Sequence, residues 1–136
     1  MSWHDNHVHA IRLTEGDNGA GELLLDIDHI LEWIKSDDQF RFRVQPAALV
    51  FHGVTFQKIS IDYAAVSAGF GPFVIDGIER HIEKRERYDA QMWRLPISWP
   101  GGEITFEATG FIQKAFGWPV VTQRQLLSPA ERPNAP

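Results

Sequence analysis

Hydrophobic and polar residues alternate one by one in two neighbouring stretches near the start of the chain, residues 7–14 and 23–28. Alternation with a period of two is typical of β-strands that bury one face. The segment between them, residues 15–21, holds three glycines, one aspartate and one asparagine, all of which favour turns. The pattern therefore predicts a β-hairpin over residues 7–28.

The apolar faces of the two stretches decide the register of this hairpin. A tight two-residue turn at Asn18 and Gly19 would place Leu13 opposite Leu24. A longer loop would instead place Leu13 opposite a member of the apolar face formed by Leu23, Leu25 and Ile27. Because a slip of one residue moves every side chain to the other face of a strand, matching the apolar faces favours the longer loop.

Most of the remaining chain shows strand-like patterns. Apolar residues at helical spacing follow Asp28, a residue type that caps helices, so one short helix is expected at residues 30–34. Strands are expected at residues 40–44, 47–54, 57–63, 91–99 and 103–111. Pro46 is expected to separate the first two of these strands. Residues 73–83 fit a helix or a strand, and a strand with a bulge at Gly77 is favoured.

About eight strands at spacings of roughly 8 to 12 residues, with one short helix and no alternation of strands and helices, indicate a mainly β fold. We expect a single-domain antiparallel β-sandwich or open barrel. The β-rich domain is expected to span residues 1–127. Residues 128–136 lose the pattern and are expected to form a frayed C-terminal tail.

The composition is that of a folded globular domain. Of the 136 residues, 43% are apolar and 23% are charged, which is enough to form a core. No apolar run reaches the roughly 18 residues that a membrane span needs. The N-terminus lacks the basic start and apolar stretch of a signal peptide, so a cytoplasmic protein is expected. The absence of cysteine excludes disulfides, thiolate metal ligands and cysteine nucleophiles.

Negative charge is concentrated in the first third of the chain. Residues 1–38 hold nine Asp or Glu against two Lys or Arg, a net charge of −7, whereas the remaining residues carry a net charge of +2. A net acidic chain argues against general nucleic-acid binding, which needs a basic face. The same acidity could attract a basic protein partner.

Three histidines lie close together at the N-terminus, which raises the question of a metal site. The candidate ligands are His4, Asp5, His7, His9 and Asp28. His7 and His9 are expected on one strand face, about 7 Å apart along the chain, where they could bind zinc with a third ligand from a neighbouring strand. The H-x-H pair resembles that of cupins, but the glycine that precedes it there is missing and Glu15 lies too far along the chain. A structural role is therefore favoured, with no metal or other cofactor.

Two kinds of side chain are candidates for partner binding. Asp26 and Asp28 alternate on one strand face and, with Arg12 across the hairpin, predict a solvated cluster of charges. Trp99 and Trp118 stand beside turn-forming glycines and prolines, where an exposed tryptophan can anchor an interface.

Three segments resemble a group of small uncharacterised bacterial proteins. They are W-H-D-x-x-V-H at residues 3–9, G-E-L-L-L-D-I-D-x-I-L-E-W at residues 21–33 and W-P-G-G-E-I-T-F-E-A at residues 99–108. The start of the chain is also similar to some immunity-protein families of bacterial toxin systems. That second resemblance implies a non-enzymatic, partner-binding role and implies no catalytic residues.

Three functions remain open from the sequence. The favoured one is a non-enzymatic protein-binding module, of an immunity-like or accessory kind, that meets a basic protein. The first alternative is a small-molecule-binding β-barrel whose many phenylalanines and tryptophans line a cavity. The second is a metal-dependent enzyme that uses the histidines and carboxylates of the N-terminus. We assign no catalytic residues, because the sequence contains no nucleophile motif that could act with these histidines and carboxylates. The oligomeric state is left open.

Overall fold

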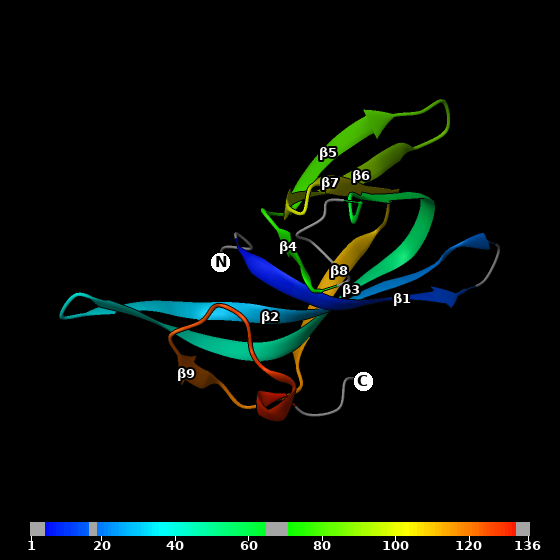
Figure 1. Cartoon of the computed structure of the whole chain (residues 1–136). Helices are drawn as coiled ribbons and strands as arrows, with labels where there is room; N and C mark the ends of the chain where they lie inside the picture. The colour runs from blue at the N-terminus through cyan, green and yellow to red at the C-terminus, as the bar shows by residue number, and fades with distance from the viewer. Residues whose placement is uncertain (1–4, 17–18, 65–70, 133–136) are drawn as a thin grey trace.

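The computed structural model describes residues 5–16, 19–64 and 71–132, and these form an antiparallel β fold (Figure 1). The strands are β1 (Asn6–Glu15), β2 (Gly21–Ser36), β3 (Gln39–Ile61), β4 (Phe73–Ile75), β5 (Glu79–Lys84), β6 (Asp89–Trp99), β7 (Gly102–Glu107), β8 (Gly110–Ala115) and β9 (Val120–Thr122). One short 3-10 helix follows at Pro129–Glu131. The expected mainly β, antiparallel class is confirmed.

Six strands form a closed ring of pairings. Following neighbours from β2 leads to β1, β4, β6, β7 and β3, and β3 pairs with β2 again. The strands β5, β8 and β9 lie outside this path, with β5 beside β6 and the other two beside β3. We expected a β-sandwich or an open barrel. The structure is a barrel, and the pairing of β3 with β2 closes it.

The long strand β3 links the ring to the rest of the sheet. One of its edges pairs with β2 along most of its length, and the other pairs with β9, β8 and β7 in turn. The expected break at Pro46 does not occur. Pro46 falls between the segment that pairs with β9, Phe42–Val44, and the segment that pairs with β8, Ala47–His52, so its missing N–H leaves no ladder bond unmade. Its carbonyl accepts a hydrogen bond from the Phe116 N–H at 3.1 Å.

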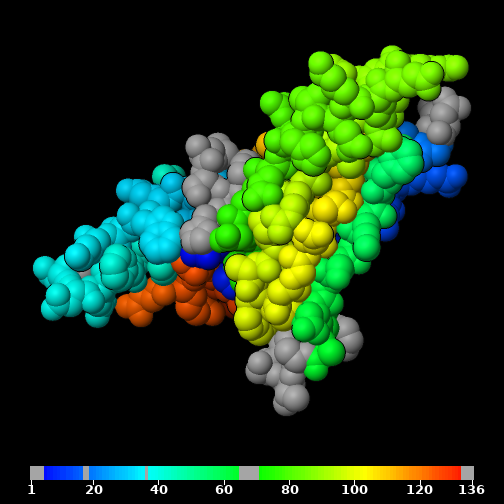
Figure 2. All heavy atoms as spheres, turned by 90° about the horizontal axis from the view of Figure 1, so that it is seen from above, coloured from blue at the N-terminus to red at the C-terminus, as the bar shows by residue number. Residues whose placement is uncertain are grey.

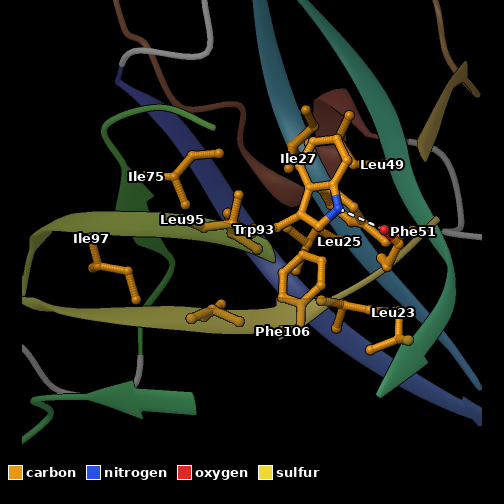
Figure 3. Close-up of a cluster of buried hydrophobic side chains, with 14 of the residues drawn as sticks. Leu23, Leu25, Ile27, Leu49, Phe51, Ile75, Trp93, Leu95, Ile97 and Phe106 are labelled. Carbon is orange, nitrogen blue, oxygen red and sulfur yellow. Dashed lines mark hydrogen bonds between the residues drawn. The ribbon is translucent and has the colours of Figure 1, made fainter. Parts of the chain in front are cut away.

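The interior of the ring is a packed apolar core (Figure 3). Its fully buried side chains include Leu23, Leu25, Ile27, Leu49, Phe51, Ile75, Leu95, Ile104 and Phe106. The Phe51 ring meets Phe106 edge to face at 4.7 Å and Trp93 at 5.4 Å. The Trp93 indole donates its N–H to the Ala108 carbonyl at 2.9 Å, which satisfies the one polar atom of that side chain.

The register of the first hairpin is the expected one. Leu13 faces Leu23 and Ile11 faces Leu25, so the apolar faces match across β1 and β2. The unbroken alternation expected over residues 7–14 does not hold, however, because a bulge interrupts β1 between Val8 and Ala10. The extra residue, His9, resets the alternation.

The expected helix at residues 30–34 is also wrong. β2 continues as a strand to Ser36, turns at Asp37 and Asp38, and pairs back along the first part of β3. Both turn residues have positive φ, 46° and 42°, as a two-residue hairpin turn requires. We call residues 30–43 the arm, because they extend past the last residue of β2 that pairs with β1, Asp28 (Figures 1 and 2).

The segment after β9, residues 123–132, lies against the base of the arm, and we call it the strap (Figure 1). Its Leu127 is buried in a second apolar cluster with Ile30, Phe42 and Val44. The chain therefore does not fray from Ser128 as expected. Ser128 caps the 3-10 helix, and the Arg132 side chain is only 8% exposed. Residues 133–136 of the expected tail lie outside the described residues.

None of the described segments forms a helix with the length and apolar character needed to cross a membrane.

Candidate functional site

Four polar residues are buried where β1 and β2 meet: Asn6, Asp26, Asp28 and His29, with exposed fractions of 0, 5, 0 and 2%. Aspartate is rarely buried so completely unless a partner compensates its charge. The partners of these side chains therefore define the first candidate site.

The sheet brings the two aspartates to one face. Asp26 and Asp28 are two residues apart on β2, so both point away from the core formed by Leu25 and Ile27. His7 of β1 stands directly opposite Asp28. We call this side of β2 and β3 the outer face.

Arg132 of the strap binds both aspartates. Its two terminal nitrogens donate to Oδ1 of Asp26 and to Oδ1 of Asp28. The planar guanidinium suits this double contact, because its N–H groups diverge in one plane. The same group lies over the Phe116 ring, 5.5 Å from its centroid. Arg132 thus joins a segment more than a hundred positions away to the first hairpin.

Asp28 has two further partners. Its Oδ2 lies 2.6 Å from Nε2 of His9 and accepts the Leu127 backbone N–H at 2.9 Å. The bulge in β1 matters here, because it turns His9 towards Asp28 rather than towards the core. With these contacts, Asp28 holds β1, β2 and the strap together.

Burial raises the pKa of the Asp26 carboxyl, and the Arg132 charge opposes this rise. Burial likewise lowers the pKa of His7, against the attraction of Asp28. Nδ1 of His7 is buried and finds no hydrogen-bond partner among the described residues. For both side chains, the effect of burial on the pKa exceeds that of the neighbouring charges. Burial therefore favours the neutral forms of the Asp26 carboxyl and the His7 imidazole.

Asn6 and His29 tie the start of β1 to β2. The Asn6 side-chain oxygen accepts the Ile30 N–H at 3.2 Å, and its nitrogen lies 3.4 Å from Nδ1 of His29. Burial is the main cause that lowers the pKa of His29. These contacts fix the point at which β2 leaves the ring and the arm begins.

The expected solvated cluster with Arg12 is therefore wrong. Asp26 and Asp28 are buried, and Arg132, rather than Arg12, pairs with them. Sequence reasoning missed Arg132 because it lies in the segment expected to fray. A usable signal was present: a strand with two aspartates among buried leucines and isoleucines needs a cation from elsewhere in the chain.

The candidate metal ligands are only partly brought together. His4 lies outside the described residues. His9 contacts Asp28, and His7 stands opposite it on the neighbouring strand. Asp5 belongs to the turn before β1. Across the described part of the chain, no three His, Asp or Glu side chains gather as metal ligands would, and the oxygens of Asp28 already accept hydrogen bonds from Arg132 and Leu127.

A second candidate site is the arm. Leu31, Trp33 and Phe40 are 40, 53 and 56% exposed. The Trp33 ring meets Phe42 edge to face at 4.8 Å, and Lys35 lies over the Phe40 ring at 5.9 Å. A helix at residues 30–34 does not predict this surface, because the arm exists only when these residues pair with β3. Exposed aromatic residues grouped on one projecting element are typical of binding surfaces.

The two candidate anchor tryptophans lie apart from the arm's tip. Trp118 is 89% exposed in the link between β8 and β9, and Trp99 is 42% exposed at the end of β6. Both are thus accessible. Of the aromatic side chains proposed to line a ligand cavity, Phe51, Trp93 and Phe106 instead pack together inside the ring, and Phe51 also contacts Phe111 of β8.

No protein-family model, curated protein or solved structure matches the chain.

Proposed function

We propose that this protein is a non-enzymatic protein-binding module, of an accessory or immunity-like kind, that contacts its partner with the arm. The observation that carries the proposal is the group of exposed side chains formed by Leu31, Trp33 and Phe40. Burying such side chains in an interface releases about 25 cal/mol per Å² of apolar surface, and tryptophan is among the residues that most often dominate binding.

The charges of the arm favour recognition by shape and apolar contact. The arm carries three acidic residues, Glu32, Asp37 and Asp38, and three basic ones, Lys35, Arg41 and Arg43. Its net charge is therefore zero. Arg132 lies against Asp26 and Asp28 and offsets one of their two negative charges, so the pair attracts a basic partner from a distance less than two free aspartates would. Short-range contacts must therefore supply most of a preference for a basic partner.

Site-specific photocrosslinking tests this proposal. A photoreactive phenylalanine analogue replaces Trp33 in one variant and Ile82 in a control variant, and each protein is irradiated in the cells that produce it. Ile82 is a matched control, because it is 52% exposed on β5, a strand outside the ring path. Adducts are separated by mass and identified by mass spectrometry.

The proposal predicts one recurrent adduct from position 33 that position 82 does not form. The crosslinked protein, once purified, should bind the unmodified chain in solution. Equal adducts from both positions, or no adduct from position 33, would contradict a partner-binding role for the arm.

A further inference from the structure

Among the described residues, the outer face continues past the strap into a hollow. A cavity of about 360 Å³ lies over β2, β3 and β8, with Leu24, Ala48, Val50, Ile112, Lys114 and Phe116 among its lining residues. Ala48 and Val50 form a buried floor, 2 and 9% exposed. The hollow is thus apolar at its base, and Lys114 and the Glu22–His52 pair line its edge.

The hollow adjoins the place where Arg132 binds. Ala48 stands directly between Asp26 of β2 and Lys114 of β8 in the strand register. Phe116, which lines the hollow, also lies against the Arg132 guanidinium. The outer face therefore offers three adjoining positions: the apolar cluster around Leu127, the aspartate pair, and the hollow.

The strap shows what the first two positions accept. Leu127 fills the cluster formed by Ile30, Phe42 and Val44, and Arg132 fills the aspartate pair five residues later. Apart from Leu127 and the Arg132 side chain, the strap is half-buried or exposed. A segment that made the same two contacts through a similar turn and also filled the hollow would bury more apolar surface than the strap does.

We propose that the outer face binds a segment of a partner protein that turns as the strap does and carries an apolar residue, an arginine five positions later and an apolar residue just beyond the arginine. In the free protein the strap occupies the first two positions and competes with the partner. The inference names the partner chemistry of the proposed function and rests on that function. It also gives the basic partner a specific contact, namely a guanidinium on Asp26 and Asp28.

The competition has a measurable consequence. The apparent affinity of a partner segment equals its intrinsic affinity multiplied by the fraction of molecules whose outer face is free of the strap. Replacing Arg132 by glutamine removes the charge that holds the strap, so this fraction should rise. The partner segment should then bind more tightly to the variant than to the wild type.

A labelled synthetic peptide provides the test. Its sequence is LLSPAERGF, which repeats residues 126–132 and adds a glycine and a phenylalanine for the hollow. Its matched control, LLSPAEQGF, lacks only the arginine charge. Binding of both peptides to the full chain, wild type and Arg132→Gln, is measured by fluorescence anisotropy. Amide spectra report whether Val50 and Ile112 move on binding.

The inference predicts saturable binding of the arginine peptide to the Arg132→Gln protein, at least about tenfold tighter than that of the glutamine peptide, since a buried pair between charged groups is lost with the arginine. Wild type should bind the arginine peptide at least about fivefold more weakly than the Arg132→Gln protein does, because the strap competes. The Val50 and Ile112 amides should shift.

Equal binding of the two peptides, or no saturable binding to either protein, would overturn the inference. The peptide pair keeps the test decisive on wild type even if the Arg132→Gln variant does not fold. The crosslink from position 33 does not involve the aspartate pair. If the two peptides bind equally but the crosslink from position 33 forms, only this inference is rejected. If the arginine peptide binds more tightly but the crosslink does not form, the arm is rejected as the contact surface.

Discussion

At the scale of single residues, the fold depends on one guanidinium placed against two buried carboxylates. Asp28 receives hydrogen bonds from Arg132 and Leu127 and contacts His9, so each of its oxygens has a partner. Such a pair adds little over a well-packed apolar substitute, but removal of one member leaves an uncompensated buried group. The network therefore acts mainly by fixing where the strap lies.

Arg132→Gln should lower the free energy of unfolding by up to about 3 kcal/mol, because both carboxylates lose their cation. Strap detachment, which returns the carboxylates to water, limits the loss. Arg124→Gln is the control: Arg124 pairs with Glu131 at 2.7 Å but is 59% exposed, and its loss should cost less than about 1 kcal/mol. Urea denaturation of both variants measures the difference, and equal losses would contradict the assigned role of Arg132.

His7, which is half-buried, and His29, which is buried, should make stability depend on pH. The pKa values of His7 and His29 in the folded chain lie below 6.5, their ordinary value. The unfolded chain therefore binds more protons as the pH falls through 6.5, and the free energy of unfolding falls with it.

The slope cannot exceed about 1.4 kcal/mol per pH unit for each histidine. His7→Gln should flatten the slope between pH 7.5 and 5.5, as measured by denaturation at several pH values. A slope that His7→Gln leaves unchanged would show that His7 is not among its sources. The raised pKa of Asp26 acts in the opposite direction, because the folded chain then holds a proton at a higher pH than the unfolded chain does.

At the scale of elements, close backbone packing closes the ring. Gly102 begins β7 and stands opposite Ile61 of β3. A Cβ at this position would lie 1.9 Å from the Ser60 carbonyl oxygen, whereas one at Gly101 would meet nothing within 4 Å. Both glycines have φ near the same value, 127° and 121°.

Gly102→Ala and Gly101→Ala therefore form a matched pair. Each should lose about 1–3 kcal/mol of stability from its positive φ. Gly102→Ala should lose at least about 2 kcal/mol more, because the methyl group separates β7 from β3. Thermal denaturation followed by circular dichroism measures both, and similar melting temperatures would argue against a tight β3–β7 contact.

The elements also show how far local patterns reach. The hairpin register followed from the sequence, because its apolar faces match in only one of the two registers. The arm did not, because Ile30, Leu31, Trp33 and Ile34 fit a helix as well as a strand that follows a bulge near Leu31. The preference for a strand there comes from pairing with β3, which no local window contains.

At the scale of the whole molecule, the sheet has two functional sides. The inner side closes around the core, and the outer side carries the aspartate pair, the strap and the hollow. Composition and alternation predicted the β class and an apolar core. They could not predict the candidate sites, because the Arg132 contact joins distant segments and the bulge at His9 depends on the pairing of β1 with β2.

The most direct test of the account is the affinity of the partner captured at position 33 for two variants of the chain. Isothermal titration calorimetry would compare wild type, Trp33→Ser and Ile82→Ser, whose substituted residues are both about half exposed. The account predicts that Trp33→Ser weakens binding by at least about tenfold, or 1.4 kcal/mol, and that Ile82→Ser leaves it unchanged. Equal affinities for Trp33→Ser and wild type would contradict the claim that the arm binds the partner.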